Sequence, residues 1–116
     1  MSRDWLLFLD DLIDSAGRIQ HITEGLDFAA FQQDISVHDA VLMNLLVIGE
    51  AVKNLPEQVR DQAPQINWRA IAGMRDLIAH KYFALDDHIV WDTVANHIAP
   101  LLDASLGIRQ ENEDTP

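Results

Sequence analysis

One short stretch of the chain, from Arg75 to Tyr82, combines residue types that can do acid–base and phosphate chemistry. Arg75 is a permanent cation whose planar guanidinium fits phosphate oxygens, and His80 can give and take protons near neutral pH. His80 is expected at the C-terminal end of a helix, which favours the protonated ring. Asp76 lies four residues earlier on the same helix face, where it could orient the ring. Lys81 adds positive charge, and Tyr82 adds a phenol.

The spacing of Arg75 and His80 sets a geometric condition on such a site. Five helical positions rotate the side chain by about 500°, so the two residues point about 140° apart on an unbroken helix. Either the helix unwinds near His80, or a two-fold axis brings a second copy alongside. We favour a symmetric dimer, with Gly73 permitting the close approach. The structural alternative is a surface ladder of ion pairs, which contributes roughly a few tenths of a kcal/mol.

Composition limits the classes of protein to which the chain can belong. Its 116 residues suit one domain, and the lack of cysteine excludes disulfides, thiolate zinc sites and a cysteine nucleophile. The net charge of −11 argues against a broad RNA-binding surface, so RNA contact must rely on a local cation cluster. Arg69, Arg75 and Lys81, with His80, are the one such cluster. The apolar stretch Trp5 to Leu9 is too short for a membrane span, and a soluble cytoplasmic protein without membrane contact is expected.

Apolar residues recur at helical spacing along most of the chain. The pattern predicts an all-α fold, an antiparallel four-helix bundle with a short helical connector and a frayed acidic C-terminal tail. Residues 1–108 are assigned to the bundle and 109–116 to a disordered tail. The expected helices cover about residues 3–24, 36–55, 67–80 and 86–102, with a short turn at 28–34 and the connector at 57–62.

Several residues mark helix ends or close contacts. Ser36 is predicted to cap the second helix, Asn67 the third, and Asp86 or Asp87 the fourth. Gly25 should end the first helix, Pro56 the second, and Pro100 should kink or shorten the fourth. Three glycines inside helices are candidates for tight helix–helix contact, within the chain or across a dimer: Gly17, Gly49 and Gly73.

Other polar and aromatic residues are interpreted structurally. The remaining histidines (His21, His38, His88 and His97) form no metal-ligand pattern, so no metal and no other cofactor is expected. The three tryptophans are expected as core or interface anchors: Trp5, Trp68 and Trp91. Glu50 is expected to pair with Lys53 or to face a dimer groove.

The pattern Arg75-x-x-x-x-His80-x-Tyr82 resembles the signature of HEPN domains, and in particular of the HepT-like ribonuclease toxins. The similarity extends to Ile48-Gly49-Glu50-Ala51, to the connector Pro64 to Trp68, to Ile71 through Asp76, and to His88-Ile89-Val90-Trp91. These segments cover part of the second helix and most of the second half of the chain. Every residue of the motif is present.

This resemblance implies a metal-independent endoribonuclease, a toxin that acts as a homodimer with a composite site. Arg75 and His80 would be catalytic, with Asp76 and Lys81 in support. The family's partner is a minimal nucleotidyltransferase antitoxin, which silences the toxin by binding or by adenylylating Tyr82. Tyr82 could instead simply pack its ring and hydrogen-bond its hydroxyl.

Two other interpretations remain open at this point. The chain could be a non-catalytic, nucleotide- or substrate-binding partner of a nucleotidyltransferase, a role to which its acidic charge is better suited. It could also be a plain helical oligomerisation domain, in which substitutions from Arg75 to Tyr82 affect only stability.

Overall fold

The computed structural model describes residues 4–113, and within this range the chain forms helices and no strand. Seven α-helices and one 3-10 helix follow one another: α1 Trp5–Ile22, α2 Phe28–Gln33, α3 Ile35–Lys53, α4 Glu57–Arg60, α5 Trp68–Lys81, η1 Tyr82–Ala84, α6 Asp87–Asn96 and α7 Ile98–Glu113. The predicted all-α class is confirmed. The predicted start of the first helix at Arg3 lies outside the described residues.

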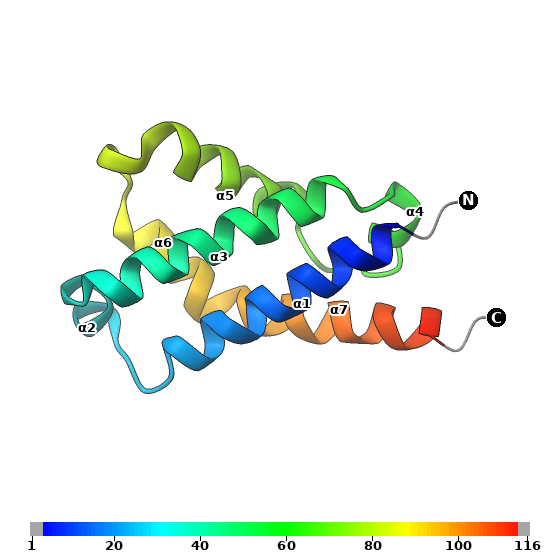
Figure 1. Ribbon diagram of the computed structural model, residues 1–116, viewed down its shortest axis with the longest axis horizontal. Helices are drawn as coiled ribbons and strands as arrows, with labels where there is room; N and C mark the ends of the chain where they lie inside the picture. Colours follow the sequence, from blue (N-terminus) through cyan, green and yellow to red (C-terminus); the bar gives the residue numbers. More distant parts are fainter. Residues whose placement is uncertain (1–3, 114–116) are drawn as a thin grey trace.

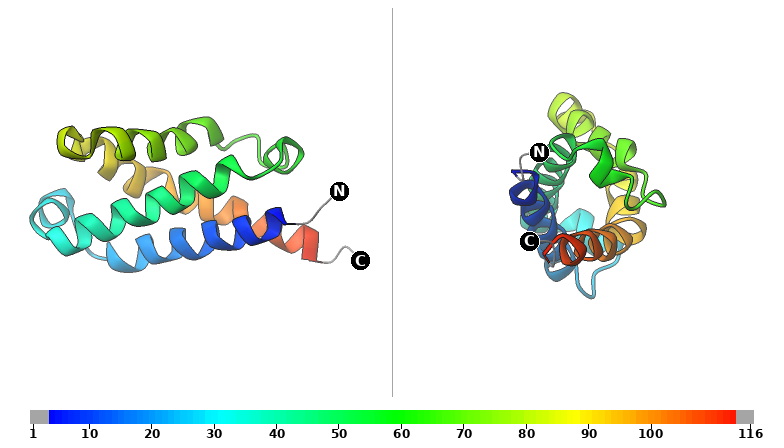
Figure 2. Two further views of the ribbon diagram at one scale, coloured as in Figure 1. Left: turned by 45° about the horizontal axis from the view of Figure 1, so that its top comes forward. Right: turned by 90° about the vertical axis from the view of Figure 1, so that its right-hand side faces the viewer.

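The long helices run alternately up and down along the molecule, as Figure 1 shows. α3 lies between α1 and α5, α7 lies beside α1, and α6 with α7 forms the fourth member of the bundle. α2 closes one end and α4 the other, and both described termini lie at the α4 end (Figures 1 and 2). The antiparallel four-helix bundle and its helical connector, α4, are therefore confirmed.

α3 is the central helix of the core. Its buried side chains repeat at helical spacing against both neighbouring helices: Val41, Leu42, Leu45, Ile48, Ala51 and Val52. Among the described residues, α3 alone has the length and hydropathy of a membrane-spanning helix. Its place between α1 and α5 explains why so many of its residues are apolar. Trp5 and Trp68 are buried as predicted, and Trp91 is half-buried.

The helix ends follow capping chemistry, with one correction to the sequence prediction. Asp34, and not Ser36, caps α3, because its Oδ1 accepts hydrogen bonds from the backbone N–H groups of Ser36 and Val37. Asn67 caps α5 and Asp86 caps α6, as predicted. Gly25 follows α1 with a φ of 76°, a conformation that favours glycine.

The predicted disordered tail is wrong for residues 109–113, which continue α7. Arg109 Nε donates to Asp10 Oδ1 at 2.8 Å, and Asn112 reaches Gln62 on the connector. These contacts with distant segments explain why a locally polar sequence stays helical. Residues 114–116 lie outside the described range. The expected effect of Pro100 is confirmed, since the fourth helix is interrupted at His97 and α7 begins at Ile98.

Only one of the three helical glycines, Gly49, is required for a close contact inside the chain. A Cβ built on Gly49 would collide with Cβ of Arg75 and would lie 3.2 Å from its backbone nitrogen. α3 and α5 are therefore in close contact at the backbone of Arg75. A Cβ on Gly17 or Gly73 would meet nothing within 4 Å, so neither supports a contact within this chain.

We expect Gly49→Ala to lower the free energy of unfolding by about 1–3 kcal/mol, because α5 must move away from α3. Gly17→Ala is the matched control, since it adds the same methyl group to a helix in open space. That variant should gain about 0.5–1 kcal/mol through helix propensity. Urea unfolding followed by circular dichroism measures both. Equal effects of the two substitutions would contradict the close helix contact.

Candidate active site

α5 carries the candidate catalytic segment, and its apolar residues fix the direction in which that segment faces. Trp68 at its start is buried, and the indole nitrogen donates to the carbonyl oxygens of Arg60 and Ala63 at 3.0 Å each. Met74 and Ile78 are buried in the core further along. With these three positions turned inward, Arg75 faces α3 along the edge of the α3–α5 contact.

Arg75 is held by acidic side chains on both helices. Its Nε lies 3.5 Å from Glu50 Oε2 on α3, and its NH1 donates to Asp76 Oδ1 at 3.1 Å. Lys53, one turn after Glu50, donates to the same oxygen of Asp76 at 2.7 Å. The hydrogen bonds from Lys53 and then Arg75 hold the pKa of Asp76 below its ordinary value. The guanidinium keeps further N–H donors free of these contacts.

Two sequence interpretations are corrected by this arrangement. Glu50 pairs with Arg75 and not with Lys53. Asp76 does not orient His80, because its contacts go to Lys53 and Arg75. Helical spacing had placed Asp76 and His80 on one face, but Lys53 of the neighbouring helix reaches the carboxylate instead. A single sequence carries no sign of that tertiary pairing.

His80 lies exposed in the last turn of α5, with no hydrogen bond or ion pair to any other described residue. α5 includes His80 and ends at Lys81, whose φ of −132° and ψ of 28° are not helical, so the backbone leaves the helix only after His80. On a regular helix the two side chains then point about 140° apart. Lys81 is exposed next to His80, and Arg69 is exposed about 9 Å along the axis from Arg75. One chain therefore does not aim Arg75 and His80 at a single point.

A shallow groove of about 470 Å³ lies beside Arg75, between α1, α3 and α5. Its lining is mainly apolar, with charged groups at the edge: Phe8, Asp11, Leu46, Val47, Glu50, Ala51, Arg75 and Ala79. Two neighbouring side chains of α3 on this side, Met43 and Val47, are exposed. Arg75 thus borders a depression, and Ala79, the neighbour of His80 in the chain, also lines it.

Tyr82 follows in η1, where an array that the sequence did not reveal holds its hydroxyl. The phenol donates to Asp39 Oδ1 at 3.2 Å, and the same oxygen lies 3.1 Å from Nδ1 of His38. Nε2 of His38 lies 2.8 Å from Asp87 Oδ1 at the start of α6. The hydrogen bond and negative charge of Asp39 raise the pKa of Tyr82. No local sequence pattern predicts these contacts, because Tyr82 and Asp39 are 43 positions apart in the chain.

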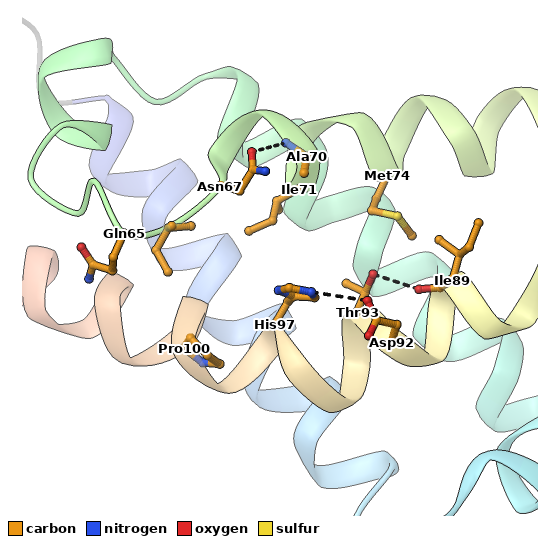
Figure 3. A pocket seen from close by; sticks show the side chains of 11 residues that line it. Gln65, Asn67, Ala70, Ile71, Met74, Ile89, Asp92, Thr93, His97 and Pro100 are labelled. Carbon is orange, nitrogen blue, oxygen red and sulfur yellow. Dashed lines mark hydrogen bonds and ion pairs between the residues drawn. The ribbon is translucent and has the colours of Figure 1, made fainter.

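A second pocket, of about 510 Å³, lies on the other side of α5, facing α6 and α7 (Figure 3). Met74 and Ile71 of α5 line it, together with Asn67, which caps that helix. His97 and Asp92 lie opposite, with Nε2 of His97 3.4 Å from Oδ2 of Asp92. Neither Arg75 nor His80 lines this pocket. Across residues 4–113, no three His, Asp or Glu side chains gather as a metal site would require.

The helical bundle and the Arg–His–Tyr segment at the end of α5 define a protein of the HEPN class. The profile of the ribonuclease HepT-like family matches residues 12–106, which include every candidate site residue from Asp39 to Asp87. The chain belongs to the HepT-like family. The resemblance seen in the sequence is thereby confirmed.

Three relatives illustrate this membership. "Putative RNase MJ0127" of Methanocaldococcus jannaschii is 38% identical over 96 residues, 83% of this chain and 79% of its own length. "Putative RNase TTE0752" of Caldanaerobacter subterraneus is 34% identical over 94 residues, 81% and 84% of the two chains. "Probable ribonuclease HepT" of Thermococcus cleftensis is 36% identical over 101 residues, 87% and 92% of the two chains. No solved structure matches the chain.

The environment of His38 makes stability depend on pH. Burial of the ring disfavours its charge, but the hydrogen bonds and charges of Asp87 and Asp39 outweigh this and raise the pKa of His38. A raised folded-state pKa stabilises the fold below the unfolded-state value and ceases to do so as the pH rises through the folded-state value. We expect His38→Gln to destabilise the protein more at about pH 6 than at about pH 9. Urea unfolding at both pH values measures the difference, and equal losses would contradict the array.

Proposed function

We propose that the chain is a metal-independent endoribonuclease, the toxin of a toxin–antitoxin pair, whose active site is shared between two copies. The proposal is supported by two residues on one helix of a HepT-like bundle: Arg75 is held by ion pairs, and His80 is exposed and pairs with no other described residue. An exposed histidine without a partner is free to exchange protons with a substrate. A guanidinium held from both sides offers its remaining donors in a fixed direction.

The reaction follows from these two groups. The ribose 2′-hydroxyl attacks the adjacent phosphate, and the 5′-oxygen leaves, giving a cyclic phosphate and a free 5′-hydroxyl. His80 moves protons as general acid or base, an effect worth typically about 10²–10⁴-fold. Arg75 stabilises the charge that builds on the non-bridging oxygens. Lys81 supports phosphate binding, and Asp76 supports Arg75 through their hydrogen bond.

A second copy is needed because Arg75 and His80 of one chain diverge on an unbroken helix. A two-fold axis beside α5 sets the arginine of one copy against the histidine of the other. The apolar groove beside Arg75, with the exposed Met43 and Val47, supplies surface for that contact. A Cβ on Gly73 would meet nothing within 4 Å in this chain, so the glycine permits a close approach by a second copy.

The acidic net charge of the chain requires that RNA contacts it only near the cations Arg75 and Lys81. The net charge of −11 disfavours long contacts with a phosphate backbone. It suits a basic protein partner, and we infer that this partner is the cognate nucleotidyltransferase antitoxin. Silencing follows from its binding or from adenylylation of Tyr82, which adds negative charge close to His80. Both proteins are expected in the cytoplasm.

The alternative is a helical partner of a nucleotidyltransferase with no catalysis of its own. The net charge of −11 favours it, since an enzyme acting on RNA is usually more basic. In that case Arg75 binds the phosphates of a nucleotide. Growth arrest by this chain expressed alone fits the ribonuclease and not the binding partner.

We expect purified protein, free of any partner, to cleave end-labelled cellular RNA in excess chelator. His80→Ala should lower cleavage by about 10²-fold or more, because proton transfer is lost. Arg75→Ala should lower it by about 10²–10³-fold, because the developing charge is no longer stabilised. Denaturing gels and single-turnover rates provide the measurement.

His21→Ala is the matched control, since it removes another exposed histidine, far from α5 on α1. It should cleave RNA as the unsubstituted chain does. Strict dependence on magnesium would contradict the metal-free mechanism. Cleavage by His80→Ala at the unsubstituted rate would contradict the site, and absence of cleavage by all variants would favour the binding partner.

A further inference from the structure

The chain has a single tyrosine, and its hydroxyl stands at the end of a hydrogen-bonded array of four side chains. Tyr82 donates to Asp39, Asp39 lies against His38, and His38 lies against Asp87, at 3.2, 3.1 and 2.8 Å. A hydroxyl, a carboxylate within hydrogen-bond reach and a third group that fixes the carboxylate form the general arrangement of an activated nucleophile. None of the ribonuclease chemistry above uses this array.

α3 supplies the two middle members of the array. His38 and Asp39 are consecutive residues in the first turns of α3, a helix whose start is capped by Asp34. They hydrogen-bond to both ends of the segment that joins α5 to α6. Asp39 contacts Tyr82 at its start, and His38 contacts Asp87 at its end. The His38 side chain is only 14% exposed, and its ring packs on Phe31, with centroids 5.3 Å apart.

The tyrosine itself is far less enclosed than the residues that hold it. Tyr82 is 45% exposed, and its ring contact is edge-on with the fully exposed Phe83, at 5.1 Å between centroids. An exposed hydroxyl can hydrogen-bond to water, so no burial cost requires a carboxylate partner. The array therefore offers an accessible oxygen with a protein base already in place.

We propose that Asp39 is the proton acceptor that makes the Tyr82 hydroxyl a nucleophile towards phosphorus, and that His38, bridged to Asp87, positions Asp39. The electrophile is the α-phosphorus of a nucleoside triphosphate, brought by the nucleotidyltransferase partner. This inference rests on the proposed function for the identity of that partner. Asp39 thus belongs to the chemistry of the modification and not to RNA cleavage.

The step balances in atoms and charge. The Tyr82 oxygen forms a bond to the α-phosphorus, and the bond from that phosphorus to the bridging oxygen breaks. Pyrophosphate leaves with the bonding electrons. The phenolic proton passes to the carboxylate of Asp39 as the new bond forms, and from there to water. The product is a nucleoside monophosphate joined to Tyr82 through a phosphodiester, beside His80 in the chain.

The first experiment follows transfer of label from a nucleoside triphosphate labelled at the α-phosphorus, with the full chain and its cognate nucleotidyltransferase. Tyr82→Phe should take no label. Asp39→Asn should lower kcat by about 10²-fold with little change in KM for the nucleotide, because it keeps the shape but loses the base. His38→Gln should cause a smaller loss of kcat, as expected of a positioning residue.

Asp10→Asn is the matched control for the loss of one carboxylate. Asp10 also bonds to a distant side chain, Arg109, but lies outside the array. It should be labelled at the rate of the unsubstituted chain. A rate for Asp39→Asn equal to that of Asp10→Asn overturns the inference, whatever the effect on stability.

A second measurement needs no partner, because the lone tyrosine can be titrated by carbon NMR with a label at its ring carbon Cζ. Asp39→Asn should bring the raised pKa of Tyr82 back towards its ordinary value, while Asp10→Asn should leave it unchanged. An identical titration in both variants overturns the contact itself.

Failure of the modification and failure of the Asp39 role give different results. If the unsubstituted chain takes no label from its nucleotidyltransferase, the modification in the proposed function is wrong and the inference falls with it. If the unsubstituted chain and Asp39→Asn take label equally fast, Tyr82 is modified and only the role of Asp39 is wrong. RNA cleavage by the chain alone is unaffected by either result and tests the ribonuclease separately.

Discussion

The contact between α3 and α5 at Gly49 determines how the rest of the site is arranged. With no Cβ on Gly49, α3 lets the backbone of Arg75 come close, and this brings Glu50 and Lys53 within reach of Arg75 and Asp76. A methyl group at position 49 would push α5 away from α3 at Arg75 and so change where its guanidinium points. The tether on the guanidinium therefore depends on a packing constraint and not on the charges alone.

α3 also holds the other end of the candidate segment. Its first turns bind Tyr82 through Asp39, while its last turns bind Arg75 through Glu50. Between these two anchors, His80 stays exposed and without a partner among the described residues. The central helix thus holds the Arg75 and Tyr82 side chains, and leaves His80 without a contact to it.

The sequence predicted the parts of this structure that local rules control. Helical periodicity identified the four-helix bundle, and the caps at Asn67 and Asp86 followed from residue type. Predictions failed where a distant segment decides the outcome. The last turns of α7 are ordered by Asp10 and Gln62, and Asp76 turns to Lys53 of α3 instead of His80. The array around Tyr82 could not be predicted from the sequence for the same reason, since its members come from α3, η1 and α6.

Mixing two inactive variants tests whether Arg75 of one copy works with His80 of another, as we propose. Arg75→Ala and His80→Ala are combined under conditions that let subunits exchange. Half of the dimers then contain one chain of each variant. In such a dimer, one of the two composite sites keeps both Arg75 and His80, so cleavage should return to about a quarter of the unsubstituted rate. The control mixes the double variant with the unsubstituted chain, where mixed dimers should add nothing. A first mixture no more active than its components, with mixed dimers present, would contradict the shared site.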